Sequence, residues 1–561
     1  MPSSPRRAFL ETPSTSSLSR FPSLVHRESW QTESPYSAGA GSRLSSLSEK
    51  YSLSPDPRAW GSDLSPDFVE PDDAIHNPDA ASLSGDNENL RFSLRGLANL
   101  GCLALLCIGI LALFVGYPIF SSVTNPSGQL HHGGSGDKNS SGVVKLIISA
   151  STTLIDMDTP QEAYTKTSSA DGTEWHLVFS DEFNTDGRTF YPGDDPYWEA
   201  ADLHYWATNN LEWYDPAAVT TVDGSLMLTF SQASSHGLNY TGGLLSSWNK
   251  FCFTGGILEA SVQLPGVNNV VGMWPAIWTM GNLGRAGYGA SLEGMWPYTY
   301  DACDVGTAPN QTLGGLPVAA TINGDTGKGG VLSYLPGQRL SRCTCDGEDH
   351  PGPKHNDGTY VGRSAPEIDM FEAQITGEPL TGQVSQSAQF APFNYAYIWD
   401  NTTDNMLISD SSISELNSFV GSVTQQATSV VTRYDDAYIS WISDGKPSWT
   451  IRAPGLGSDP LVNISARSIP QEPMYMIINL GMSRNFGFVD LDHLIFPNHM
   501  RVDYIRVYQN PSAINIGCNP PDFPTNDYII QHIEAYTNPN LTTWRGDYGQ
   551  PFPRSSLLDG C

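Results

Sequence analysis

The sequence predicts an all-β fold: an antiparallel β-sandwich that follows a disordered tail and one membrane-spanning helix. From about residue 172, short apolar or alternating runs such as SLMLTF, GILEASVQL and VDYIRVYQ recur between clusters of Gly, Asn, Asp and Pro. This spacing of strands and turns is typical of a sandwich, and no long amphipathic helical stretch competes with it. The amino-terminal part differs, because an uncharged apolar segment at residues 96–120 follows a Ser- and Pro-rich stretch.

The amino-terminal segments predict a type II membrane protein. Residues 1–95 have no sustained hydrophobic period, so we expect a disordered tail. Residues 96–120 are long enough to cross about 30 Å of hydrocarbon. Arg91 and Arg95 precede this span, and the next charge after it is Asp137. The positive-inside tendency therefore predicts a cytosolic tail, an anchor in the lipid bilayer and a luminal or extracellular remainder. We expect residence in the endoplasmic reticulum, the Golgi or the plasma membrane.

Glycosylation sequons and cysteines agree with this orientation. All N-x-[ST] sequons follow the span, at Asn139, Asn239, Asn310, Asn401, Asn463 and Asn540. Six cysteines also follow it, and an oxidising compartment would allow disulfides in any of fifteen pairings. We divide this part into a stalk (121–171), the β-domain (172–510) and a carboxyl-terminal strap (511–561). The strap contains Cys518 near its start and Cys561 at its end.

The composition narrows the classes of partner. The chain has 59 acidic and 29 basic residues, for a net charge of −30, which argues against nucleic acid. An acidic surface suits a neutral polysaccharide, although many acidic proteins are acidic for solubility alone. The histidines show no metal-ligand spacing, so we expect no catalytic metal. The chemistry inferred below needs only two carboxyl groups, so we expect no cofactor.

The stretch APEIDMFEAQ at 365–374 carries the candidate chemistry. Glu367, Asp369 and Glu372 lie among apolar residues typical of a packed strand, where three carboxylates would repel one another. The bare E-x-D-x-x-E pattern is weak evidence, since about 0.6 matches are expected by chance in a chain of this length. In a regular strand, Glu372 would face away from the other two acids. A β-bulge near Met370 and Phe371 would return it to their face.

Two glutamates on one face would suit a retaining glycosidase. That mechanism needs carboxyl groups about 5–5.5 Å apart, one as nucleophile and the other as acid and then base. Asp369 between them would hydrogen-bond a neighbour and help to separate their pKa values, leaving Glu367 ionised and Glu372 protonated.

EIDMFE resembles the β-bulge form of the active-site signature of glycoside hydrolase family 16. Other segments match that family in order: WHLVFSDEFN, NNLEWYDPAAVTTVDGSLMLTF, FTGGILEASVQLP, GMWPAIWTM and VDYIRVYQ. The resemblance implies a concanavalin-like β-jelly roll whose concave sheet holds a glucan. By position it implies that Glu367 is the nucleophile, Asp369 the assisting acid and Glu372 the acid/base.

A narrower resemblance covers nearly all of the chain beyond the tail. The signal anchor, APEIDMFEAQ, GQVSQSAQFAPFN and CNPPDFPTNDYIIQHIEAYTNPNLTTW resemble fungal β-glucan synthesis-associated type II membrane proteins, which are required for cell-wall β-1,6-glucan. Secreted laminarinases commonly carry His residues on the strand after the catalytic one. This chain has Gln386 and Gln389 there instead, and both become candidate ligands of sugar hydroxyls.

Two further positions, Trp274 and Asn210, are candidates for the site. Trp274 is either a sugar platform beside the cleft or a core residue, whereas Trp278 leans to the core. Asn210, in NNLEW, is a further candidate for the cleft. Glu182 and Asp503 match positions near a structural calcium site in many relatives, but no Asp-rich calcium loop is visible, so plain strand-end acids are favoured.

The sequence thus predicts a membrane-anchored retaining β-glucan glycosidase or transglycosylase in wall β-1,6-glucan synthesis. The alternatives are a non-catalytic glucan-binding scaffold and an assembly factor for other wall enzymes. The linkage cleaved and the acceptor stay open.

Overall fold

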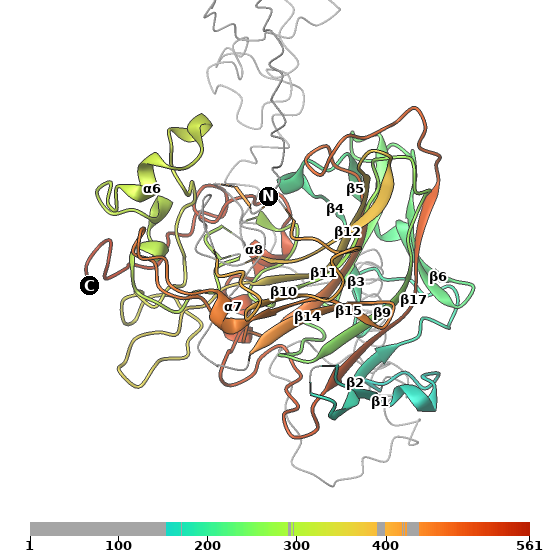
Figure 1. Ribbon diagram of the computed structural model, residues 1–561, viewed down its shortest axis with the longest axis horizontal. Helices are drawn as coiled ribbons and strands as arrows, with labels where there is room; N and C mark the ends of the chain where they lie inside the picture. Colours follow the sequence, from blue (N-terminus) through green and yellow to red (C-terminus); the bar gives the residue numbers. More distant parts are fainter. Residues whose placement is uncertain are drawn as a thin grey trace, which may run out of the picture. The chain divides into compact units, whose positions relative to one another are not determined.

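The computed structural model describes residues 153–169, 171–289, 293–295, 297–389, 399–417, 419, 421–422 and 437–561 (Figure 1). The predicted tail and membrane span, and most of the predicted stalk with Asn139, lie outside these residues. Within the described residues, no helix is both long and apolar enough to cross a membrane. All of them belong to one unit of the chain, 135–561.

Two large sheets and one small sheet make up the fold. The first sheet has the order β1 (Thr165–Thr167), β2 (Glu174–Asp181), β17 (Asn498–Gln509), β7 (Ser225–Phe230) and β6 (Val219–Val222), with β9 (Ile257–Gln263) also paired to β17. The small sheet has the order β13 (Met406–Ile408), β15 (Lys446–Arg452) and β14 (Tyr438–Ser443).

The second large sheet carries the predicted acids. Its order is β12 (Thr381–Gln389), β11 (Glu367–Thr376), β10 (Trp274–Gly281), β16 (Met474–Gly481), β8 (Tyr240–Ser246), β5 (Glu212–Tyr214) and β4 (Leu203–His204), and β3 (Glu199–Ala200) also pairs with β8. All strand pairs of the described residues are antiparallel except β5 with β8. The predicted antiparallel β-architecture is therefore confirmed.

Helical structure in the described residues is short. The α-helices are α6 (Ala319–Ile322), α7 (Asn526–Gln531) and α8 (Ile533–Thr537). The 3-10 turns are η3 (Gln161–Ala163), η4 (Trp206–Thr208), η5 (Pro216–Ala218), η6 (Val305–Thr307), η7 (Pro309–Gln311), η8 (Thr326–Lys328) and η9 (Ala453–Gly455).

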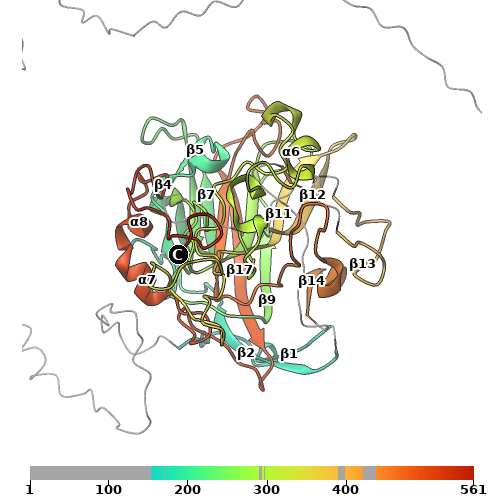
Figure 2. The same ribbon diagram turned by 90° about the vertical axis from the view of Figure 1, so that its left-hand side faces the viewer.

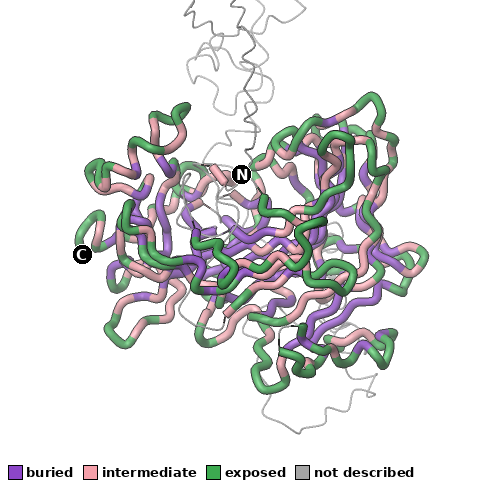
Figure 3. The backbone as a smooth tube through the Cα atoms, in the orientation of Figure 1, coloured by how far each residue is buried: buried purple, intermediate pink, exposed green. Residues whose placement is uncertain are grey.

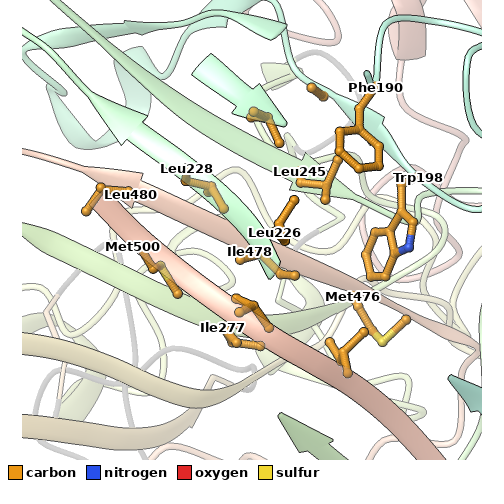
Figure 4. Packing of buried hydrophobic residues seen from close by; sticks show 14 of the residues in the cluster. Phe190, Trp198, Leu226, Leu228, Leu245, Ile277, Met476, Ile478, Leu480 and Met500 are labelled. Carbon is orange, nitrogen blue, oxygen red and sulfur yellow. The ribbon is translucent and has the colours of Figure 1, made fainter. Parts of the chain in front are cut away.

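The main core lies between the two large sheets. Figure 4 shows Leu226 and Leu228 on β7 packing with Leu245 on β8 and with Ile478 and Leu480 on β16. Successive residues of a strand point to opposite faces, so the neighbours of these residues lie on the other side of the second sheet. Buried segments follow the strands through the middle of the domain (Figure 3).

Two segments cover part of that other side. We call them the insertion, residues 282–366 between β10 and β11, and the strap, residues 511–561. Figure 2 shows α7 and α8 of the strap beside β4. The disulfide Cys252–Cys518 ties the start of the strap to the segment after β8, and Cys345–Cys561 ties its end to the insertion. A third disulfide, Cys303–Cys343, lies within the insertion.

Candidate active site

The three acids of β11 share one face because the strand contains a bulge. On β10, Ala276 pairs with Glu372, Trp278 with Asp369 and Met280 with Glu367, and the register shifts once within this run. The pairing of β11 with β12 shifts between Asp369 and Glu372 as well. Alternate residues of β10 lie on one face, and directly paired residues lie on the same face. The predicted bulge is therefore confirmed, and it turns all three acids toward one side.

Glu367 and Glu372 line a cavity on the sheet face away from the main core. Its empty space is about 540 Å³ with its mouth included. Ten residues besides Glu367 and Glu372 line it: Tyr205, Thr208, Asn210, Tyr214, Leu244, Trp274, Ala276, Trp278, Gln389 and Asn479.

Glu372 lies in surroundings that favour its protonated form. Burial raises its pKa to about 8, and repulsion from Asp369 acts in the same direction. The Trp274 Nε1–H donates a hydrogen bond of 3.1 Å to Glu372 Oε1 and opposes this rise in pKa. At neutral pH Glu372 therefore holds a proton that it can donate.

Asp369 is fixed between its neighbours. Burial raises its pKa to about 6, while hydrogen bonds with Glu367 and Ser387 oppose the rise. Ser387 Oγ donates to Asp369 Oδ2 at 2.6 Å, and Trp441 Nε1 donates to the Asp369 carbonyl at 2.7 Å. The second bond holds the backbone directly before the bulge. Asp369 is thus placed to orient Glu367 and to raise the pKa of Glu372.

Most of the predicted binding residues surround the same cavity. Gln389 pairs directly with Glu367 across β11 and β12, so both face the cavity. The Trp274 ring also lines it and stacks on Phe486 with 4.4 Å between ring centroids, which leaves one ring face for a ligand. Trp278, assigned to the core, is buried but also lines the cavity and donates to Asn479 Oδ1 at 2.8 Å.

Asn210 lines the cavity, but its amide hydrogens are already bonded. Its Nδ2 donates to Glu212 Oε1 at 2.6 Å and to the Tyr214 hydroxyl at 3.1 Å. Thr208 Oγ1 donates to Asn210 Oδ1 at 2.6 Å. Asn210 therefore holds the wall of the cavity together.

The structure corrects the predicted role of Gln386. Ser385, Ser387 and Gln389 pair with the acids, so Gln386 lies on the opposite face of β12. Its Nε2 donates to Ser443 Oγ of β14 at 3.2 Å. The prediction that it joins Gln389 as a ligand in the same cleft is wrong.

Several other residues that line the cavity carry little or no signal in the sequence. Asn479 is the one amide side chain within the apolar run MYMIINL, and this contrast with its neighbours is a signal that the sequence does contain. Tyr205 gives no such signal, because nothing in its local sequence separates it from the neighbouring aromatic residues. Glu212, two residues after Asn210, is fully buried, and burial raises its pKa to about 8.

The remaining predicted positions lie elsewhere. Arg506 donates two hydrogen bonds, of 2.9 and 2.7 Å, to the Glu182 carboxylate. Asp503 is exposed. Among the described residues, no cluster of three His, Cys, Asp or Glu side chains could hold a metal ion. Of the described sequon asparagines, Asn401, Asn463 and Asn540 are exposed, and Asn239 and Asn310 are half-buried.

Comparison with known proteins places the chain in a family. The family model described as Beta-glucan synthesis-associated protein SKN1/KRE6/Sbg1 matches residues 63–437 and 433–561. The chain is 43% identical over 539 residues to the Beta-glucan synthesis-associated protein SKN1 of Candida albicans, covering 89% of this chain and 68% of that protein. It is 41% identical to KRE6 of Saccharomyces cerevisiae, covering 88% of this chain and 69% of that protein.

More distant similarities involve a glycanase and a glucanase. Endo-1,3-1,4-beta-glycanase EglC of Rhizobium meliloti is 31% identical over 160 residues, covering 24% of this chain and 31% of that protein. The solved structure of endo-beta-1,3-glucanase from Pyrococcus furiosus matches with 17% identity and a TM-score of 0.32, covering 63% of this chain and 98% of that one. By the family model and the two close relatives, the chain belongs to the SKN1/KRE6/Sbg1 family of beta-glucan synthesis-associated proteins.

Proposed function

We propose that the protein is a retaining β-glucan glycosidase or transglycosylase that acts in the synthesis of cell-wall β-1,6-glucan. One observation carries the proposal: a bulge brings three acids to one face, and burial raises the pKa of Glu372 to about 8. A pair with one carboxyl held protonated beside another carboxyl is what retaining chemistry uses. Membership in a family named for β-glucan synthesis supports the choice of substrate.

The proposed reaction has two steps. In the first, Glu367 attacks the anomeric carbon, the glycosidic C–O bond breaks, and Glu372 gives its proton to the leaving oxygen. In the second, Glu372 takes a proton from the hydroxyl of an acceptor, which attacks the anomeric carbon and releases Glu367. Asp369 and Glu367 share one proton through their hydrogen bond, which positions Glu367, and this proton stays on Asp369 as Glu367 attacks. A sugar acceptor extends or branches a glucan, and a water acceptor hydrolyses it. Two carboxyl groups suffice for both steps, so no cofactor is invoked.

The location of the site is part of the proposal. Residues 96–120 would anchor the chain in a membrane of the secretory pathway, with the acids on the luminal or extracellular side. The uncharged segment, the two preceding arginines and the sequons beyond it support this orientation. Wall precursors on that side would be within reach of the cavity.

The change Glu367→Gln tests the proposal. It removes the nucleophile but keeps the size of the side chain, so we expect the loss of wall β-1,6-glucan in cells that rely on this variant. Glu378→Gln is the matched control, because Glu378 is exposed in the turn between β11 and β12. Normal β-1,6-glucan with Glu367→Gln, at normal protein abundance, would overturn the catalytic proposal and favour a non-catalytic scaffold.

A further inference from the structure

The face of the second large sheet that carries the acids does not form an open groove across all of its strands. Leu244, Tyr214 and Leu203 continue the face of the acids across β8, β5 and β4, as the strand registers show. In an open groove these side chains would form the floor and meet solvent. Instead, they are only 3%, 2% and 1% exposed.

The insertion and the strap pack on this floor and leave only the cavity open beside Leu244 and Tyr214. The floor residues share one buried cluster with side chains of both segments, among them Leu283 and Tyr288 of the insertion and Tyr536 and Trp544 of the strap. The backbone of the insertion approaches very closely over β4. A Cβ atom added to Gly287, whose φ is +88°, would lie 2.8 Å from Leu203 Cδ2, so a side chain there would force Leu203 to move. The second sheet therefore has no through-going groove at its β4 end.

A second wall closes the side of the cavity beside η4. The segment after η4 is bonded to the segment after β16: Asn209 Nδ2 donates to Asn485 Oδ1 at 3.2 Å, and Leu211 N donates to the Met482 carbonyl at 2.9 Å. Directly beyond, Phe486 stacks on Trp274. The wall thus runs from η4 to the tryptophan beside Glu372.

The two catalytic glutamates differ in their access to solvent. Glu367 is only 7% exposed, and Met280 and Tyr475, which continue its row across β10 and β16, are 1% and 0% exposed. Glu372 and Trp274 are half-buried and lie toward the mouth. In retaining chemistry the acid protonates the leaving oxygen, while the nucleophile holds the glycosyl unit. The leaving part of the substrate therefore lies at the mouth, and the glycosyl unit lies in the closed end.

We propose that the cavity takes the terminal, non-reducing end of a β-glucan chain and excludes internal segments. The inference rests on the proposed function and adds the class of substrate. The enzyme thus transfers or releases short terminal units, because a chain that continued beyond Glu367 would meet the buried Tyr475 and the insertion, whose Ala286 N–H donates to the Tyr475 hydroxyl at 2.9 Å.

Binding to glucans with and without chain ends tests this inference. The full-length Glu367→Gln protein in detergent would be titrated with linear β-1,3- and β-1,6-linked oligosaccharides of two to six units and with a cyclic β-1,3;1,6-glucan, which has no ends. We expect linear ligands to bind, with an affinity that stops rising after about three units. We expect the cyclic glucan and linear ligands capped at the non-reducing end to bind at least ten-fold more weakly.

Trp206→Ala provides a second, independent measurement in the same background. A Cβ atom on Gly289 would lie 2.6 Å from Trp206 Cζ2, so this ring fills the contact between η4 and the insertion. Removal of this ring should reduce the ratio of the affinity for linear glucan to the affinity for cyclic glucan. Trp213→Ala is the matched control, since Trp213 stacks on His236 instead.

The outcomes separate the two proposals. Equal affinity for cyclic and linear glucans in the Glu367→Gln protein would overturn the closed-end inference and leave the proposed function standing. Absence of binding to every β-glucan, in this protein and in the unmodified one, would overturn the proposed function and this inference with it.

Discussion

Replacing Trp274 by Phe should raise the pKa of Glu372 and move the alkaline limit of activity upward. Trp274 Nε1–H is a donor to Glu372 Oε1, at 3.1 Å, and this bond favours the ionised carboxylate. Phe cannot donate a hydrogen bond, but it can keep the stacking on Phe486. The variant therefore changes the proton equilibrium of Glu372 more than the shape of the site.

The size of this shift follows from the hydrogen bond. Hydrogen bonds to charged groups contribute about 1.5–3 kcal/mol, and one pKa unit corresponds to about 1.4 kcal/mol. The 3.1 Å distance is at the long end of the usual range and Glu372 is half-buried, so we take the lower value. We expect an upward shift of roughly one pH unit.

The assay is the pH dependence of kcat/KM for release or transfer from an end-labelled β-glucan oligosaccharide, which reports groups of the free enzyme. Glu372 must be protonated for the first step, so activity falls as the pH passes its pKa. In the unmodified protein we expect this fall near pH 8. Trp213→Phe is the control and should leave it in place. An alkaline limb that stays fixed or moves downward with Trp274→Phe would refute the assignment of Glu372 as the acid.

Three other changes test separate parts of the account. Asp369→Asn removes the charge that repels the ionised Glu372, so the alkaline limb of the same pH profile should move downward; an upward shift would contradict the assigned coupling. The pKa of Glu372 is about 8 in the folded protein against 4.5 for the free side chain, so its contribution to stability is lost as the pH rises between these values. Glu372→Gln should therefore melt a few degrees above the unmodified protein at pH 8 and close to it at pH 5, and a difference independent of pH would argue against a raised pKa. Arg363 is fully buried and lies 2.9 Å from the Glu472 carboxylate. Glu472→Gln removes the counter-charge of Arg363 and should lower the free energy of unfolding by about 3–5 kcal/mol. Glu348→Gln, in the exposed pair with Arg554, should lower it by less than about 1 kcal/mol, and equal melting temperatures of the two variants would contradict this.

The face of the three acids could be predicted because it depends on local geometry. The strand period of two placed Glu372 on the wrong side, and one bulge was the simplest change that would correct it. The same period should have separated Gln386 from Gln389. Positions three apart in a regular strand face opposite ways, and the structure follows that rule. This error came from grouping the two glutamines by chemistry instead of by face.

The closed end of the cavity could not be predicted from local sequence. It depends on contacts between segments far apart in the chain, such as Cys252 and Cys518, which are 266 residues apart. Pairing of the cysteines was open among fifteen arrangements, and Cys343 and Cys345, two residues apart, join different partners. The role of Trp274 was also open between core and platform. It lines the cavity and bonds to Glu372.

The most direct test of the central claim combines product stereochemistry with trapping of the nucleophile. The full-length protein would react with a 2-deoxy-2-fluoro β-glucosyl donor, which slows release of a covalent intermediate, and the labelled peptide would be identified by mass spectrometry. In parallel, proton NMR would follow the first product formed from a natural β-glucan oligosaccharide. The account predicts a glycosyl mass on Glu367 and a first product that keeps the β-configuration. An α-configured first product, or a label on another residue, would contradict it.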